Sequence, residues 1–195
     1  MKKVLFIVSI LFVAVISTAC INNFAVQDLN NKAKAYMEKG DYTQAIERLK
    51  SSIDLDPSVF ETHYNLAVVY TKAEDYINAV EEYKKVIEMK PEMVDAYYSL
   101  ATAQNNLAVE LEQGYIRTLP DGTLYKPKAE DVDFEAKYEP GDNEKQIIHE
   151  LYQSALENYE KYLELNPEAP EKKDLEALFE TINKKLNPQE AEIVQ

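Results

Sequence analysis

The sequence GDYTQAIERLKSSIDLDP, residues 40–57, occurs three times along the chain in varied form. The second copy is EDYINAVEEYKKVIEMKP at residues 74–91, and the third is HELYQSALENYEKYLELNP at residues 149–167. The prolines that end the first two copies, Pro57 and Pro91, are 34 residues apart. A period of this length, with room for two helices in each unit, indicates a helical repeat architecture.

The copies agree at the places where paired helices would touch. Each has a small residue where two helices come closest, an aromatic residue three places earlier and a large residue four places later. In chain order these trios are Tyr42, Ala45 and Leu49; Tyr76, Ala79 and Tyr83; and Tyr152, Ala155 and Tyr159. The preceding helix of each unit carries its own set: Leu29, Ala33 and Tyr36; His63, Ala67 and Tyr70; and Tyr97, Ala101 and Gln104. In both sets the residues recur at intervals of three or four, which places one apolar face on each helix.

This pattern resembles the tetratricopeptide repeat (TPR), in which helix-turn-helix units stack into a solenoid. The resemblance implies an all-α fold with repeats over residues 27–58, 59–92 and 93–168. Two places depart from the family pattern, because Lys32 replaces a leucine in the first unit and Gln104 replaces a tyrosine in the third.

A capping helix is expected over residues 169–187, because no single unit can bury its own apolar face. Pro170 suits a first helical turn, and Asn187 with Pro188 would stop the helix. Its apolar residues follow at helical spacing: Leu175, Leu178, Phe179, Ile182 and Leu186. Residues 188–195 are left as a tail.

The third unit is interrupted by an insertion at about residues 108–149. We expect it to lengthen the unit's first helix as far as Gly114 and to start the second helix early, at a cap formed by Asp142 or Asn143. Between these helices, the turn sequence around Asp121 predicts a small β-hairpin.

Aromatic residues of this loop, among them Tyr115, Tyr125 and Phe134, are candidates for partner contact. Long loops in compact domains tend to be functional or disordered. The alternative is a tolerated insertion with no specific role.

The first residues, MKKVLFIVSILFVAVISTAC, have the layout of a secretory signal over residues 1–19. Cys20 is the only cysteine, and the residues before it resemble the bacterial lipobox, except that Ser17 stands where that box prefers Leu, Val or Ile. The resemblance implies cleavage before Cys20, a lipid with acyl chains such as palmitate on that residue, and a short tether over residues 20–26. An uncleaved helix and free secretion are the alternatives.

The implied location is the cell envelope, with the protein exported and held at a membrane. Ile21 follows the cysteine in place of the aspartate that retains lipoproteins in the inner membrane of enteric bacteria. The expected location is therefore the outer membrane, if the organism has one.

The formal net charge of −14 argues against a nucleic-acid partner, which would require a clustered basic face. A basic protein partner fits the charge better. The alternative is that the acidic residues only keep a helical surface soluble.

No motif in the sequence indicates catalysis, and we expect no enzyme activity, cofactor or metal site. His63 and His149 fall on different predicted helices without ligand-spaced neighbours. A glycine-rich phosphate loop and a nucleophile-elbow serine are both lacking.

TPR solenoids usually receive peptides on the concave face formed by the first helix of each unit. In this chain the resemblance maps that face to Asn30, Lys34, Tyr64, Asn65, Val68, Thr71, Tyr98, Thr102 and Asn105. Tyr98 and Thr102 stand where the family's clamp for a C-terminal carboxylate has basic residues, so such a clamp is not expected.

The leading hypothesis is a membrane-anchored adaptor of the bacterial envelope that binds a protein or peptide. The alternative is a dedicated subunit of one envelope complex, of the pilus, secretion or outer-membrane assembly type, attached through the insertion. The oligomeric state is left open.

Overall fold

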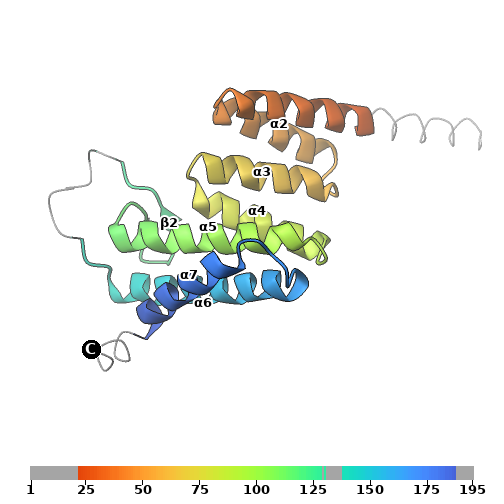
Figure 1. Ribbon diagram of the computed structural model, residues 1–195. Coiled ribbons are helices and arrows are strands. Elements are labelled where there is room, and N and C mark those ends of the chain that lie inside the picture. Colours follow the sequence, from red (N-terminus) through yellow and green to blue (C-terminus); the bar gives the residue numbers. More distant parts are fainter. Residues whose placement is uncertain (1–21, 129, 131–137, 188–195) are drawn as a thin grey trace, which may run out of the picture. The chain divides into compact units, whose positions relative to one another are not determined.

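The computed structural model describes residues 22–128, 130 and 138–187, and these are almost entirely helical (Figure 1). The predicted all-α fold is confirmed. Residues 22–38 form the first helix. The labelled elements are α2 (Tyr42–Leu55), α3 (Phe60–Lys72), α4 (Tyr76–Met89), α5 (Val94–Gln113), β1 (Arg117–Thr118), β2 (Leu124–Tyr125), α6 (Asp142–Leu165) and α7 (Lys172–Leu186).

The chain divides between Ala73 and Glu74 into two compact units. We call the described residues before this point unit 1 and those after it unit 2. Unit 1 contains the first helix, α2 and α3, and unit 2 contains the remaining elements.

Unit 1 is held by contact between α2 and α3, whose apolar faces are buried. Ala45 and Leu49 of α2 and Leu66 and Ala67 of α3 are each at most 2% exposed. The carboxylate of Asp41 caps α2 by accepting a hydrogen bond from the backbone N–H of Gln44 at 3.1 Å. In the first repeat, the second helix is therefore capped by Asp41, the residue that follows Gly40.

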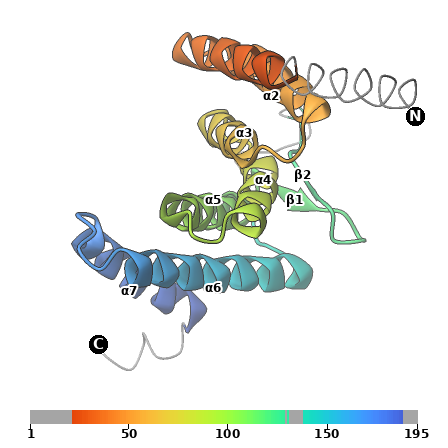
Figure 2. The ribbon, with the colours of Figure 1, turned by 90° about the vertical axis from the view of Figure 1, so that its right-hand side faces the viewer.

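Unit 2 is built around α5 and α6, which run side by side in Figures 1 and 2. Ala101 of α5 and Ala155 of α6 are fully buried and share one apolar cluster. Gln104, which departs from the repeat pattern, is 3% exposed, and its Oε1 accepts a hydrogen bond from Nδ2 of Asn158 at 2.9 Å. The polar replacement is tolerated because its amide finds a partner across the α5–α6 interface.

Helix α7 caps unit 2 as predicted. Leu175 joins the cluster of α5 and α6 residues, and Ile182 is 1% exposed. Leu178 and Phe179 pack against the same cluster. The apolar stripe of α7 therefore covers a face that the third repeat leaves open.

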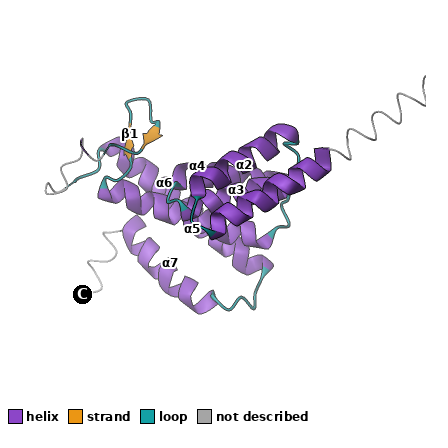
Figure 3. Cartoon of the chain, turned by 90° about the horizontal axis from the view of Figure 1, so that it is seen from above, coloured by secondary structure: helices purple, strands orange, loops and turns teal. Residues whose placement is uncertain are grey.

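The insertion adopts the predicted hairpin between two lengthened helices. Gly114 ends α5 in the left-handed region, with φ +75°. The strands, orange in Figure 3, pair antiparallel with Arg117 opposite Tyr125 and Thr118 opposite Leu124. The turn residues at 120–122 thus form the hairpin that their sequence predicts.

The predicted cap of α6 is wrong by one or two residues. Gly141, rather than Asp142 or Asn143, occupies the N-cap position. Its backbone N–H donates to Glu144 Oε2 at 2.9 Å, so the carboxylate three residues later closes the first turn. A glycine can serve because Glu144 supplies the polar side chain of the cap.

Residues 22–26, the described part of the predicted tether, are helical. Val26 is only 5% exposed, so its burial holds this turn in the helix. Cys20, Phe134 and the tail at 188–195 lie outside the described residues. Within the described part, no helix is long and apolar enough to cross a bilayer.

We predict that replacing Gly114 with alanine destabilises the protein more than the same change at Gly40. Both glycines follow a helix with φ near +75°, which costs an alanine about 1 kcal/mol. A Cβ on Gly114 would lie 2.6 Å from Cγ of Tyr138, whereas one on Gly40 would meet nothing within 4 Å. The extra crowding should raise the loss in unfolding free energy to about 2 kcal/mol or more, measured by urea denaturation. Equal losses for the two variants would contradict the close contact.

Candidate functional site

In unit 1, predicted binding residues of the first helix (residues 22–38) and of α3 lie close together. These are the first helices of repeats one and two. Nδ2 of Asn65 on α3 donates to Oδ1 of Asn30 on the first helix at 3.1 Å, so the helices lie side by side at this point. Lys34 and Asn65 are exposed, and Tyr64 and Val68 are half-buried. This is a mixed polar, aromatic and apolar surface, which we call the unit 1 face; Thr71 of α3 completes it.

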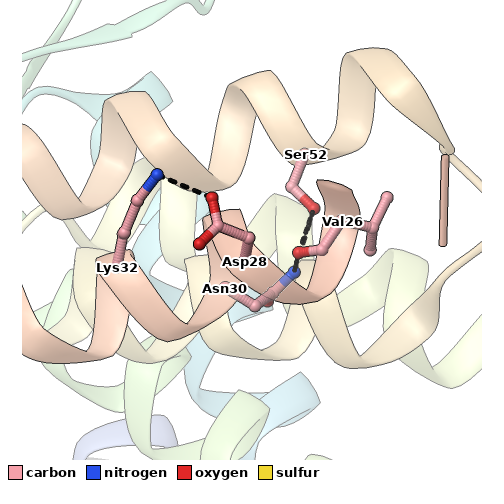
Figure 4. A network of polar contacts seen from close by, with 5 residues as sticks. All are labelled: Val26, Asp28, Asn30, Lys32 and Ser52. Carbon is pink, nitrogen blue, oxygen red and sulfur yellow. Dashed lines mark hydrogen bonds and ion pairs between the residues drawn. The ribbon is translucent and has the colours of Figure 1, made fainter. Parts of the chain in front are cut away.

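The side-chain amide of Asn30 links the helices that form this face. Its Nδ2 lies 2.9 Å from Val26 O and 2.9 Å from Ser52 Oγ (Figure 4), and 3.0 Å from Thr62 Oγ1. Ser52 and Thr62 are fully buried. An amide nitrogen has two protons, so these three acceptors share them. Asn30 therefore ties the first helix to α2 and α3, a structural role that the surface mapping did not include.

Lys32, which replaces a leucine of the repeat pattern, lies near this network. Its position explains why the replacement is tolerated. Its Nζ is 2.6 Å from Oδ2 of Asp28, and its side chain is 57% exposed (Figure 4). Ala33 beside it is buried. The lysine therefore occupies the outer side of the helix and removes no apolar side chain from the core.

Unit 2 uses two of its predicted binding residues for internal packing. The ring centroid of Tyr98 is 5.1 Å from that of Tyr162 and 5.7 Å from that of Tyr159. The hydroxyl of Thr102 donates to the backbone O of Tyr98 at 2.9 Å and lies 3.0 Å from the hydroxyl of Tyr159. Asn105 is half-buried. Tyr98 and Thr102 are therefore anchored against α6.

The hairpin presents the aromatic residues predicted there. Tyr115 is 45% exposed, Tyr125 is 37% exposed, and Leu119 at the turn is 43% exposed. Exposed apolar residues gathered on one small element are characteristic of a contact surface. We call these three residues the hairpin surface.

One buried carboxylate attaches the hairpin to α6. Glu144 accepts hydrogen bonds from the backbone N–H of Thr118 at 3.0 Å, the hydroxyl of Tyr138 at 2.6 Å and the backbone N–H of Gly141 at 2.9 Å. The guanidinium of Arg117 lies 5.1 Å from the ring centroid of Tyr138. The strand, the returning chain and the start of α6 thus meet at Glu144.

The electrostatics of this attachment favour an ionised glutamate beside a protonated tyrosine. Burial opposes ionisation of Glu144, but the hydrogen bonds from Tyr138, Gly141 and Thr118 outweigh it and hold the pKa of Glu144 below its ordinary value. Burial, the hydrogen bond to Glu144 and the charge of that carboxylate raise the pKa of Tyr138 to about 12. Both groups keep these states at neutral pH.

The sequence interpretation missed Glu144, although a local signal was present. A glutamate three residues after a residue that can cap a helix is the pattern of a capping box. The contacts with Thr118 and Tyr138 had no such signal, because they depend on how the hairpin folds back.

The fold matches those of solved TPR domains. Residues 33–74 match a family model described as TPR repeat, and residues 60–93 match one described as tetratricopeptide repeat. No curated protein matches the sequence.

Three solved structures illustrate the likeness. The first TPR domain of human RPAP3 is 17% identical over 85% of this chain and 95% of its own, with a TM-score of 0.54. The Arabidopsis OM64 TPR domain is 14% identical over 84% and 98%, with a TM-score of 0.56. The first TPR of Spaghetti (RPAP3), bound to the HSP90 peptide SRMEEVD, is 17% identical over 83% and 92%, with a TM-score of 0.55. At these identities the likeness establishes the TPR fold.

We predict that Glu144→Gln loosens the hairpin. The amide keeps one acceptor oxygen for three donors, so the free energy of unfolding should fall by about 1–3 kcal/mol. Amide hydrogen exchange at Thr118 should become faster. Glu160→Gln, at an exposed position of the same helix, is the matched control and should change neither measurement. Unaltered exchange at Thr118 in Glu144→Gln would show that the carboxylate does not hold the strand.

The same carboxylate predicts a pH dependence. Because the folded-state pKa of Glu144 is lowered, its stabilising contribution is complete above the unfolded-state pKa, about 4.3, and is lost as the pH falls through the folded-state pKa. The backbone N–H resonances of Thr118 and Gly141 should therefore titrate with a midpoint below about 4.3. A midpoint at or above that value would contradict the arrangement.

Proposed function

We propose that this protein binds a partner protein or peptide along the unit 1 face. The proposal rests on the contrast between the buried and the exposed side chains of the first helix and α3. Their packing positions, such as Ala33 and Ala67, are buried, while Lys34 and Asn65 remain exposed and Tyr64 is half-buried. A surface that combines an aromatic side chain with polar donors is suited to hold a peptide backbone and one apolar side chain.

The solved TPR structures support a binding role by analogy. Among them, the first TPR of Spaghetti holds an HSP90 peptide, and the second TPR domain of human RPAP3 is in complex with the HSP70 peptide SGPTIEEVD. We propose binding rather than catalysis for this chain on the same architectural ground.

The chemistry of the partner should differ from those acidic peptides. The chain carries a net charge of −14, so long-range attraction favours a basic or neutral segment. Tyr98 and Thr102, at positions where a carboxylate clamp would need cations, pack against α6. We therefore propose a basic or neutral partner for the unit 1 face.

We further propose that Cys20 carries a lipid and holds the protein at a membrane of the bacterial envelope. The support is the signal layout of residues 1–19 and the position of the only cysteine directly after it. Two or more acyl chains would make the attachment effectively permanent, at about 0.8 kcal/mol per buried methylene. With helix already present at residue 22, the folded part would lie close to that membrane.

The second candidate function is that of a dedicated subunit of an envelope complex, attached through the hairpin surface. The observation that favours it is the ordered hairpin, fixed by Glu144 with exposed Tyr115 and Tyr125. An insertion without a role would not need this attachment to α6. In this candidate the unit 1 face is incidental.

Paired substitutions distinguish the two candidates. We predict that Lys34→Ala with Tyr64→Ala lowers the recovery of crosslinked partner from the protein's own cells by at least about tenfold, since contact residues of this type each contribute about 1 kcal/mol or more. Tyr115→Ser with Tyr125→Ser should leave recovery unchanged. Asp54→Ala on the exposed side of α2 is the control.

The converse result, with loss only in the hairpin variant, would favour the dedicated subunit. Recovery that survives both double substitutions would contradict both candidates. Circular dichroism on each variant confirms that the helices remain folded.

Membrane attachment has its own test. We predict that Cys20→Ala moves the protein from the membrane fraction to the soluble fraction or blocks its maturation, because the acceptor of the lipid is gone. Labelling with radioactive palmitate should disappear in the same variant. Unchanged attachment without label would instead favour an uncleaved apolar helix. This outcome is independent of partner binding.

A further inference from the structure

A hollow of about 520 Å³ lies in unit 2, and none of the three hairpin-surface residues lines it. It is formed where the C-terminal end of α5, the first turns of α6 and the C-terminal end of α7 meet. Glu112 and Ile148 both line it, and both belong to the lengths of helix that the insertion adds. An ordinary repeat of 34 residues would not contain these helix ends.

The hollow has apolar walls. Tyr152 is 2% exposed and Ile148 is 8% exposed, so both are fixed by packing. Pro140 and half-buried Leu186 complete the apolar lining. These walls can cover an aliphatic side chain without rearrangement.

The side-chain ammonium of Lys185 lies against these walls and is held by two contacts. The ammonium of Lys185 pairs with the carboxylate of Glu112 and donates to the hydroxyl of Tyr152 at 2.6 Å. It also lies 4.7 Å from the ring centroid of Tyr152. An ammonium has three N–H donors, and contacts within the described part of the chain use two of them. One donor therefore remains for a ligand.

The tyrosine of this group stays protonated. Burial, and then the hydrogen bond and charge of Glu112, raise the pKa of Tyr152 above its ordinary value. Glu112 is thus satisfied by Lys185 and Tyr152, and it does not need a cation from a ligand.

The rim of the hollow adds positive charge. Lys145 lines it with a side chain that is 65% exposed, and its Nζ is 3.9 Å from Asp142, at the limit of an ion pair. His149 lines the same edge and is exposed. With Lys185 paired to Glu112, the lining carries an excess of positive charge in a chain that is otherwise strongly acidic.

We propose that this hollow, which we call the lysine pocket, binds a short segment of a partner protein in which an apolar side chain is followed by an acidic one. The apolar side chain would lie against Ile148 and Leu186, and the carboxylate would accept hydrogen bonds from Lys185 and Lys145. The pocket favours a peptide over a membrane surface because its fixed donor, Lys185, lies beside apolar walls in a hollow, which a flat array of headgroups does not enter. The proposal concerns a second site and is independent of binding at the unit 1 face.

The test is nuclear magnetic resonance on the full chain with labelled isoleucine and leucine methyl groups, held in phosphatidylcholine nanodiscs. The probe is the peptide acetyl-Ala-Leu-Glu-Ala-amide at millimolar concentration. Its two matched peptides replace either the glutamate with glutamine or the leucine with alanine. We expect the first peptide to shift the methyl resonances of Ile148 and Leu186, and each matched peptide to bind about tenfold more weakly.

Variants of the protein distinguish specific binding in the pocket from unspecific electrostatic attraction of the peptide. Lys145→Gln with His149→Gln removes the ammonium of Lys145 and the ring of His149 from two exposed positions, and it should weaken binding about fivefold without altering the fold. Lys173→Gln, exposed at the start of α7 and outside the pocket, is the control and should bind as the unaltered chain does.

Four results would overturn the proposal. The first is an absence of methyl shifts at Ile148 and Leu186 with the probe, and the second is equal affinity for all three peptides. The third is a shift produced only by adding phosphatidylglycerol to the nanodiscs, which would assign the pocket to a lipid surface. Equal weakening by the rim variant and by Lys173→Gln would likewise indicate unspecific charge attraction.

Discussion

Close approach of paired helices is the constraint on which the structure depends, and alanine at the crossing points makes it feasible. Ala45 in unit 1 and Ala101 and Ala155 in unit 2 have no exposed surface. A larger side chain at any of them would separate helices whose apolar faces can be buried only against each other. The tyrosines around these points fill the space that the alanines leave, and in unit 2 Tyr159 also reaches across to Thr102.

Local patterns in the sequence predicted the helices, the capping helix and the hairpin, because each depends on neighbours within a few residues. The contacts that define the candidate sites are different in kind. Asn30 was assigned to a surface, yet its amide reaches Ser52 and Thr62 on two other helices. The contact between Lys185 and Glu112 joins α7 to the end of α5. Periodicity shows which face a residue occupies, and it does not show which polar groups from distant segments will meet there.

The insertion extends the apolar interface of the third repeat. Its residues lengthen α5 and α6 along an existing interface, so the added turns bury Leu111 and Ile148. The hairpin between them is joined to α6 by Glu144 and closed at α5 by a glycine that leaves room for the ring of Tyr138. The third repeat thereby gains an aromatic hairpin and a pocket with a fixed ammonium.

The amide of Asn30 also selects the alignment of the helices in unit 1. Apolar side chains alone tolerate a shift of one helix along another, because a turn of helix, about 5.4 Å, returns a similar face to the interface. Such a slip would leave this amide, Ser52 and Thr62 without partners inside the protein, at a cost of about 1–3 kcal/mol for each stranded group. A single polar residue thus fixes the register of three helices, and with it the spacing between Lys34 and Tyr64.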